Sequence, residues 1–421
     1  MLYIYNLGYS KPNGLNSQIV EMRKLLKDVS KFTKMSIETF EKCTEKWRDI
    51  LQEKLRSIGM HDEIINDMIS SGYYMMNQSD EIIYDSFYGR RYSISIEALK
   101  KFLQSNPKIF SSRGIQAIEV KSIADAKKQI DKFISRFNPE LSNRWAYRGE
   151  NSIFTFKRKF PNPWISNSNG EERSLMSSHW RGFQNNYMKR VSYSSRSIFQ
   201  TIHADDIIYD GIKDFRNLSA KNSIKYGIHT LSDLEDFPEP ENQEYFKRWQ
   251  AHKINPYNSP DMYYLEQHYG FSTPCLDITF DLATAMFFAL NKYVEIDKDQ
   301  KIATYKPVDD ISQSVVYVFL FPSDIMTSND IIRKFDVFSH LEPLRPLRQT
   351  CQQFGTNMFN INEPAAYIVL QIHFSSDFDL EGLPTQKDLI PFADEDKFYA
   401  KLLEMKSKKP DIWGNITEYI I

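Results

Sequence analysis

The chain has 421 residues, of which 41% are hydrophobic and 26% charged, an ordinary composition for a globular protein of two or three domains. Its 53 basic and 55 acidic residues give a formal net charge of -2, which argues against a surface uniformly basic for nucleic acid. Three widely spaced cysteines, Cys43, Cys275 and Cys351, exclude a disulfide framework and a Cys-x-x-Cys metal pair.

The start of the chain, Met-Leu-Tyr-Ile-Tyr, lacks the basic segment and the long apolar run of a signal peptide. The longest strongly apolar runs, residues 285–290 and 315–321, are too short to cross a bilayer. The sequence therefore predicts a cytoplasmic protein that does not associate with a membrane.

The first 115 residues carry apolar side chains at helical spacing. Stripes over residues 19–32 and 37–58 recur every three or four positions, and shorter ones fit residues 62–70 and 95–103. Polar residues cover the other faces of these segments, so the helices are expected to pack on one another. This pattern predicts an N-terminal helical domain over residues 1–115.

A break in composition near residues 106–114 marks the expected start of a second domain, residues 116–421. Ser122 opens a helix there, with Asp125 three residues after the cap. Helices mixed with strands predict an α+β fold. The other elements expected in this domain are a strand over 144–149, a loop over 161–170, a helix over 171–190, an irregular insertion at about 195–260, strands over 315–321 and 365–372, and a helix over 394–406 capped by Asp394.

The most informative stretch covers residues 265–290. Thr273, Asp277 and Thr279 alternate with apolar residues, as on a strand with one polar face, and a very apolar helix follows. Buried polar groups have to be paired, so this cluster is either a structural hydrogen-bond network or the wall of a site. His268 could act as a general acid or base because its ordinary pKa is near neutral, or it could be held by backbone hydrogen bonds.

Arg148 lies at the end of a predicted strand, before Gly149, which is expected to let the backbone turn sharply. An arginine so placed can grip a phosphate or carboxylate through two hydrogen bonds. It can instead form a structural ion pair with Asp277 or with another acidic residue. That aspartate could instead accept from a ligand hydroxyl, or cap the helix that follows it.

Residues 345–355 form a third polar group, with Arg345, Arg348 and Gln353 among its members. Such a composition suits a ligand-facing loop between strands. The eight histidines show no metal-ligand spacing, so no metal site is expected. No phosphate-binding loop, dinucleotide-binding glycine motif or Gly-x-Ser-x-Gly motif occurs, which argues against common NTPase, Rossmann and hydrolase mechanisms.

Three motifs, in the same order along the chain, resemble the FRG domain, a mainly bacterial family named for its Phe/Tyr-Arg-Gly motif. The resemblance covers about residues 116–408. Tyr147-Arg148-Gly149-Glu150 is similar to the opening Phe/Tyr-Arg-Gly-Gln, residues 265–290 are similar to Gln-His-Tyr-Gly, Thr-Arg-Leu-Leu-Asp-Trp-Thr and an alanine-rich helix, and residues 348–355 are similar to a late Arg…Gln-x-Gly. The sequence departs from the pattern at Pro274 (usually Arg), Ile278 (usually Trp), Glu150 (usually Gln) and Phe354, which intrudes before Gly355.

The order of these motifs also resembles ADP-ribosyltransferases, at the level of the fold. This resemblance implies that Arg148 contacts the ribose or phosphates of NAD, and that Gln353 takes the late catalytic position. A glutamine carries no charge to stabilise an oxocarbenium ion, which predicts slow transfer. The residues expected to bind NAD are Tyr147, Arg148, Gly149, His268, Thr273, Thr279 and Arg348, and those expected to be catalytic are Arg148, Asp277 and Gln353.

Together the resemblances imply a helical domain followed by an FRG domain with a mixed β-sheet and flanking helices, of ADP-ribosyltransferase-like form. The expected function is a bacterial defence or toxin effector that transfers ADP-ribose from NAD to a protein or nucleic acid, or hydrolyses NAD. The N-terminal domain would bind a regulatory partner. Two alternatives stay open: a non-catalytic module that binds a nucleotide or a protein, and a nucleic-acid binder that uses Arg345 and Arg348.

Overall fold

The computed structural model describes most of the second half of the chain and several separate segments of the first half. The ranges are 42–79, 81–104, 115–137, 145–181, 267–270, 275–321, 332–334, 344–356, 359–408, 410, 414 and 416–420. Predictions for residues 19–32, for the boundary at 106–114, for all of 195–260 and for Thr273 fall outside the described residues.

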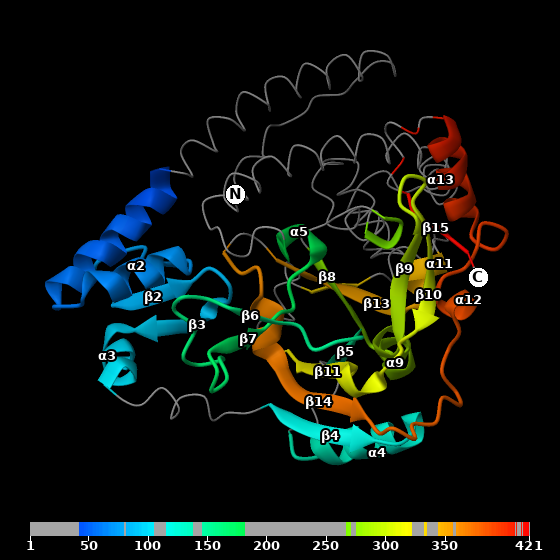
Figure 1. Ribbon diagram of the computed structural model, residues 1–421, viewed down its shortest axis with the longest axis horizontal. Coiled ribbons are helices and arrows are strands. Elements are labelled where there is room, and N and C mark those ends of the chain that lie inside the picture. Colours follow the sequence, from blue (N-terminus) through cyan, green and yellow to red (C-terminus); the bar gives the residue numbers. More distant parts are fainter. Residues whose placement is uncertain are drawn as a thin grey trace, which may run out of the picture.

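The centre of the structure is a seven-stranded mixed sheet of order β12-β13-β8-β5-β11-β14-β4 (Figure 1). Only the pairing of β14 with β4, at one edge, is parallel. The mixed sheet with helices confirms the predicted α+β class. The strands are β4 (Gln116–Val120), β5 (Trp145–Glu150), β8 (Cys275–Thr279), β11 (Val315–Leu320), β12 (Ile332–Lys334), β13 (Cys351–Gly355) and β14 (Ile368–Phe374).

One face of the sheet is covered by α4 (Ile123–Ile134) and α9 (Leu282–Leu290), whose apolar residues share a core with β11 and β14. As predicted, α4 begins at the cap Ser122, whose side chain accepts from the Asp125 amide. The α9 helix is apolar on nearly every side, and it is buried on nearly every side. Its cap is Asp281, so the prediction that Asp277 caps this helix is wrong.

Gly149 lies inside β5, and the sharp turn predicted there does not occur. The glycine instead allows α9 to lie directly against the strand. A Cβ atom at this position would meet the carbonyl oxygen of Ala285 at 1.8 Å and the amide nitrogen of Ala289 at 2.7 Å. Because both atoms belong to the helix backbone, no side-chain rotation can relieve the clash.

We therefore expect Gly149→Ala to lower the free energy of unfolding by about 1–3 kcal/mol or more, since overpacking in a dense core forces the backbone to shift. Urea denaturation measures this change. Gly59→Ala is the matched control, because Gly59 has φ +78° but no neighbour within 4 Å of an added Cβ. Gly59→Ala should lower the free energy of unfolding by only roughly 1 kcal/mol, the cost of holding an alanine in the left-handed backbone conformation. Equal stability of Gly149→Ala and wild type would contradict the close-packing role.

The N-terminal part of the chain is not purely helical, which corrects the prediction for residues 1–115. Helices do occur at residues 42–57, ending at Gly59, and at the predicted third and fourth positions, as α2 (Asp62–Ser70) and α3 (Ile96–Gln104). Between them, however, lies an antiparallel sheet of order β1-β2-β3. Tyrosines and β-branched residues form its strands, which are β1 (Tyr73–Tyr74), β2 (Ile82–Asp85) and β3 (Gly89–Ser95).

This N-terminal sheet packs against the central one. Phe87 and Tyr88, which follow β2, belong to the same core cluster as Leu276 and Ile278 of β8. In Figure 1 the N-terminal elements lie at the left of the sheet, and α4 lies along β4 at its lower edge. The N-terminal sheet and the central sheet therefore share one hydrophobic core.

Residues 155–181 also pack into the hydrophobic core that the N-terminal sheet shares with the central sheet. The helix predicted over 171–190 is wrong where it is described, because its start forms a short hairpin strand and only four residues are helical. Glu172 and neighbouring polar groups satisfy buried partners instead of lining a helix face. The elements are β6 (Thr155–Lys157), β7 (Glu171–Arg173) and α5 (Ser178–Arg181).

Most of the remaining helices and strands, namely α11, α12, α13, β9, β10 and β15, lie on the right-hand side of Figure 1. The last helix is capped by Asp396, whose side chain accepts from the Tyr399 amide, and not by Asp394 as predicted. The elements are β9 (Asn291–Asp297), β10 (Ile302–Pro307) and β15 (Glu418–Tyr419), which form a three-stranded sheet, with η5 (Ile311–Gln313), α11 (Leu344–Arg348), η7 (Glu363–Tyr367), α12 (Gln386–Leu389) and α13 (Lys397–Lys408).

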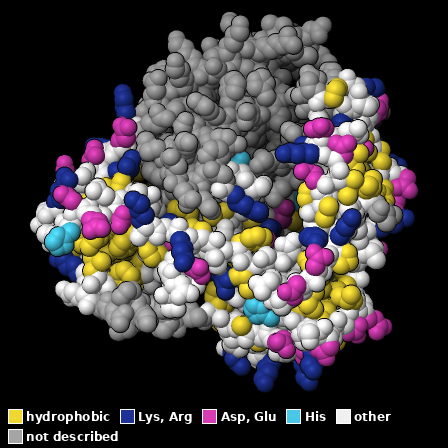
Figure 2. All heavy atoms as spheres, in the orientation of Figure 1, with side chains coloured by type: hydrophobic (Ala, Val, Ile, Leu, Met, Phe, Trp, Pro, Cys, Tyr) yellow, Lys and Arg dark blue, Asp and Glu magenta, His cyan; other side chains and the backbone are white. Residues whose placement is uncertain are grey.

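The surface of the described residues carries charges of both signs in close mixture, as Figure 2 shows for one face. This agrees with the near-zero formal charge of the chain. No helix among the described residues has the length and apolar character that crossing a bilayer requires.

Candidate functional site

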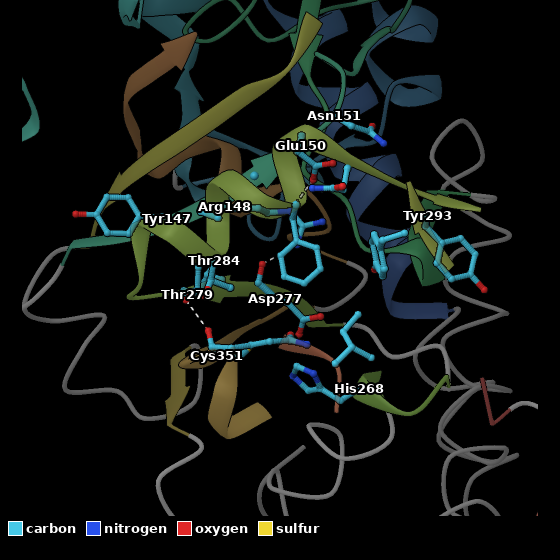
Figure 3. Close-up of a pocket in the computed structure, with 18 of the residues that line it drawn as sticks. Tyr147, Arg148, Glu150, Asn151, His268, Asp277, Thr279, Thr284, Tyr293 and Cys351 are labelled. Carbon is cyan, nitrogen blue, oxygen red and sulfur yellow. Dashed lines mark hydrogen bonds and ion pairs between the residues drawn. The ribbon is translucent and has the colours of Figure 1, made fainter. Parts of the chain in front are cut away.

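A cavity of about 430 Å³ lies where α9, β5 and β8 meet the small C-terminal sheet (Figure 3). Its wall combines charged groups with aromatic rings. The residues that line it include Tyr147, Arg148, Gly149, Glu150, Phe154, Arg181, Gln267, His268, Asp277, Thr279, Thr284, Phe288, Tyr293, Tyr305, Arg345, Gln349, Cys351 and Tyr419.

The cavity exists because two adjacent strands separate. β5 and β8 pair only at Tyr147 and Thr279. Beyond this point the strands diverge, and the guanidinium of Arg148 reaches across the opening. Its Nη1 donates to the backbone carbonyl of Asp277 at 2.6 Å. The separation of β5 from β8 therefore creates the cavity and places the Arg148 side chain where the two strands part.

Asp277 is held in a fixed orientation by two amide side chains. Gln267 donates to Oδ2 at 2.7 Å, and Gln353 donates to Oδ1 at 3.0 Å. Gln353 lies on β13 directly opposite Asp277 and is fully buried. The carboxylate of Asp277 thus lines the cavity while the two glutamine side chains fix its orientation. Figure 3 shows it between Arg148 and His268.

Arg148 forms an ion pair inside the cavity. Its Nε donates to Glu150 at 2.6 Å, and the two side chains keep 19% and 12% of their exposure. Burial by itself lowers the pKa of Arg148, but the carboxylates of Glu150 and Asp277 outweigh it and raise that pKa. The guanidinium therefore stays charged while protein oxygens take its Nε–H and one Nη1–H.

His268 and Cys351 lie on the other side of Asp277. One ligand atom from each of these three residues lies within 4.8 Å of the others. Burial lowers the pKa of His268, so the imidazole is neutral at pH 7. Burial also raises the pKa of the Cys351 thiol well above its usual value, and Asp277 adds to this effect. The metal-free thiol is therefore protonated and a poor nucleophile.

Thr279 and Tyr147, two of the residues expected to bind NAD, both line the cavity, and Thr279 also has a structural role. The Thr279 hydroxyl donates to the carbonyl of Gln349 at 2.7 Å and accepts from the Asp281 amide at 3.0 Å. Tyr147 and Arg148 leave β5 on opposite sides, as neighbours on a strand do, and Figure 3 shows Tyr147 pointing away from Arg148. Thr279 thus fixes the turn from β8 into α9.

Two predicted positions do not line the cavity. By strand alternation, Gln353 and Arg148 face opposite sides of the sheet. Gln353 donates to the carboxylate of Asp277, and Arg148 donates to its backbone carbonyl. Gln353, which was expected to be catalytic, is therefore not among the residues that line the cavity. Arg348 points to a second cavity, where it pairs with Glu395 at 2.6 Å. Thr273 lies outside the described residues.

The sequence pattern missed several cavity residues. Arg345 is conspicuous in the sequence only as a basic residue, yet it is buried, with its guanidinium 3.7 Å from the centre of the Tyr399 ring, and it donates to the His268 carbonyl. The spacing of the cysteines gives no sign that Cys351 lines a cavity. The aromatic wall, with Phe288 and Tyr293, is assembled from separate elements, so no local spacing could reveal it.

Comparison with protein families gives one match. Residues 208–298 fit the family model described as FRG domain. This stretch of the chain is similar to an FRG domain. Comparison with curated proteins and with solved structures gives no match.

The FRG match covers much of the cavity wall, because Gln267, His268, Asp277 and Thr279 all lie within the FRG span. It also includes most of the stretch predicted as an irregular insertion, residues 195–260. Arg148, Glu150, Arg345 and Cys351 lie outside the matched FRG span. The FRG-like stretch thus supplies one side of the cavity, and flanking segments of the same chain supply the other.

Proposed function

We propose that this cavity binds NAD and cleaves its nicotinamide–ribose bond, passing ADP-ribose to a macromolecular acceptor or to water. The observation that carries the proposal is the Asp277 carboxylate, oriented by Gln267 and Gln353 at the wall of a cavity that also holds the Arg148 guanidinium. Defence or toxin activity against other macromolecules would be the biological role that this chemistry serves.

The charges of the cavity suit such a substrate. NAD brings two negative phosphates and a positive nicotinamide, so a pocket for it needs both a cation and a carboxylate. Arg148 provides the cation and keeps enough exposure to be reached by a phosphate or ribose. Rings such as Phe288 and Tyr293 provide apolar faces against which the planar bases can stack.

The proposed reaction breaks the bond between the ribose C1′ and the nicotinamide nitrogen. The nitrogen keeps the electron pair and leaves as neutral nicotinamide, while positive charge develops on the ribose. A fixed carboxylate stabilises this oxocarbenium ion without reorganising, a role we assign to Asp277 in place of the uncharged Gln353. The acceptor hydroxyl or water then bonds to C1′, and its proton passes to a base, for which the neutral imidazole of His268 is the nearest candidate.

The ion pair between Arg148 and Glu150 favours a second candidate function, a module that binds a nucleotide without cleaving it. In such a module the guanidinium would be structural, since protein oxygens already occupy two of its N–H groups. The two functions differ in a measurable way, because only the first releases nicotinamide.

The test is to incubate purified protein with NAD labelled in the nicotinamide ring, with and without cell extract as acceptor. We expect wild type to release nicotinamide and Arg148→Ala to lose NAD binding and release while remaining folded. Arg56→Ala, an exposed arginine far from the cavity walls, is the matched control and should behave as wild type. Binding of NAD without release supports the module, and absence of both overturns both candidates.

A further inference from the structure

We propose that His268, Asp277 and Cys351 form a binding site for a transition-metal ion such as Zn²⁺. The three residues bring a nitrogen, an oxygen and a sulfur ligand atom within 4.8 Å of one another. All three line the cavity. They come from three separate segments, which explains why no histidine or cysteine spacing indicates a site.

The donor set matches the ion. Zn²⁺ binds imidazole nitrogen and carboxylate oxygen at about 2.0–2.2 Å and thiolate sulfur at about 2.3 Å, in tetrahedral geometry. Ligand atoms around it are therefore roughly 3.3–3.8 Å apart. The ligand atoms lie within 4.8 Å of one another, so binding requires the His268 and Cys351 side chains to rotate toward the carboxylate of Asp277. Three protein ligands leave the fourth position open toward the cavity, as in zinc sites that hold water or a substrate.

Groups around the trio support the site in two ways. Gln267 and Gln353 each donate to one oxygen of Asp277, which is how outer hydrogen bonds orient a metal-bound carboxylate. Of the two arginines beside the trio, Arg148 is paired with Glu150, whereas Arg345 donates to the His268 carbonyl and lies against the ring of Tyr399. On binding, the Cys351 thiol releases its proton to water, and thiolate plus carboxylate balance the two charges of Zn²⁺.

The ion and NAD cleavage would exclude each other, a consequence that rests on the proposed function. Zn²⁺ coordinated by Asp277 takes the carboxylate that stabilises the oxocarbenium ion, and it occupies His268 as well. A metal-loaded chain should then release nicotinamide more slowly than a chelated one. Metal binding itself requires no NAD and is measured separately.

The experiment dialyses the full chain against a chelator, then against Zn²⁺, and measures bound zinc by mass spectrometry. Absorption of the Co²⁺-loaded protein gives a second readout, because cobalt bonded to thiolate has a charge-transfer band. We expect one ion per wild-type chain, and loss of the ion and of the band in Cys351→Ala. Cys275→Ala is the matched control: Cys275 is equally buried on β8 but lies outside the trio, so its variant should keep both.

Gln267→Ala tests the outer hydrogen bond and should weaken zinc affinity by about 10–100-fold while circular dichroism stays unchanged. Equal zinc content in wild type and Cys351→Ala, or a wild type that binds none, overturns the site. A chain that binds zinc but never cleaves NAD keeps the metal site and removes the proposed function. A chain that cleaves NAD but binds no ion does the reverse.

Discussion

Asp277→Asn should lower the rate of nicotinamide release by roughly 10²–10³-fold, the usual cost of removing one group that stabilises developing charge in a transition state. The asparagine keeps the size of the side chain but loses the negative charge. Because the charge acts on the oxocarbenium ion more than on bound NAD, kcat should fall while KM changes little. Steady-state kinetics in the presence of a chelator measures both constants without interference from metal.

The control for Asp277→Asn is Asp309→Asn, which removes a carboxylate from an exposed position outside the cavity. It should leave kcat unchanged. A circular dichroism melt checks that Asp277→Asn is folded, since Gln267 and Gln353 must re-pair with the new amide. A folded Asp277→Asn that keeps the wild-type kcat would show that the carboxylate does not stabilise charge in the reaction.

Arg158→Ala should lower the free energy of unfolding by about 3–5 kcal/mol, as expected when one partner of a buried ion pair is removed. Arg158 pairs with Asp85 of β2 at 2.8 Å and with Glu172 of β7 at 2.9 Å, and the three side chains are at most 3% exposed. It also donates to the carbonyl of Ser71. The substitution would leave two carboxylates buried without a cation. Urea denaturation measures the loss.

Arg56→Ala is the matched control for Arg158→Ala. Arg56 pairs with Asp62 at 2.9 Å, but both side chains are more than half exposed, so the loss should be below about 1 kcal/mol. Burial already raises the pKa of Glu172. Without Arg158 the pKa of Glu172 in the folded state rises further above its value in the unfolded chain. The folded state then binds a proton at a higher pH than the unfolded state does, so the destabilisation should shrink as pH falls from 7 toward 5. Similar losses of unfolding free energy for Arg158→Ala and Arg56→Ala would mean that the ion pairs of Arg158 with Asp85 and Glu172 do not stabilise the packing of β2 against β7.

Local patterns predicted many elements because their causes are local. The helix at residues 62–70 follows from apolar spacing, and α4 follows from the cap at Ser122. The predictions fail where pairing decides the structure. Residues 73–95 carry tyrosines and isoleucines that fit either a helix face or a strand, and only their antiparallel partners make them β1, β2 and β3.

The candidate site divides in the same way. Arg148, Asp277, His268 and Thr279 could be proposed from motifs because polar residues at strand ends are conspicuous among apolar neighbours. The part played by Gly149 could not, because it depends on the backbone of α9, more than 130 residues away along the chain. Register likewise removed Gln353 from the cavity wall, since a strand's alternation is fixed only by its partner.

By itself, the sequence determined the class of fold, the local helices and strands with clear periodicity, and the FRG-like motifs that brought Asp277 and Arg148 to notice. Only the tertiary structure decided that β5 and β8 separate after one residue pair, that Arg148 bridges the opening, and that Cys351 comes close to His268 and Asp277. The reason is physical: periodicity and caps act within a few residues, whereas a cavity is formed by surfaces whose relative positions are set by packing of the whole chain.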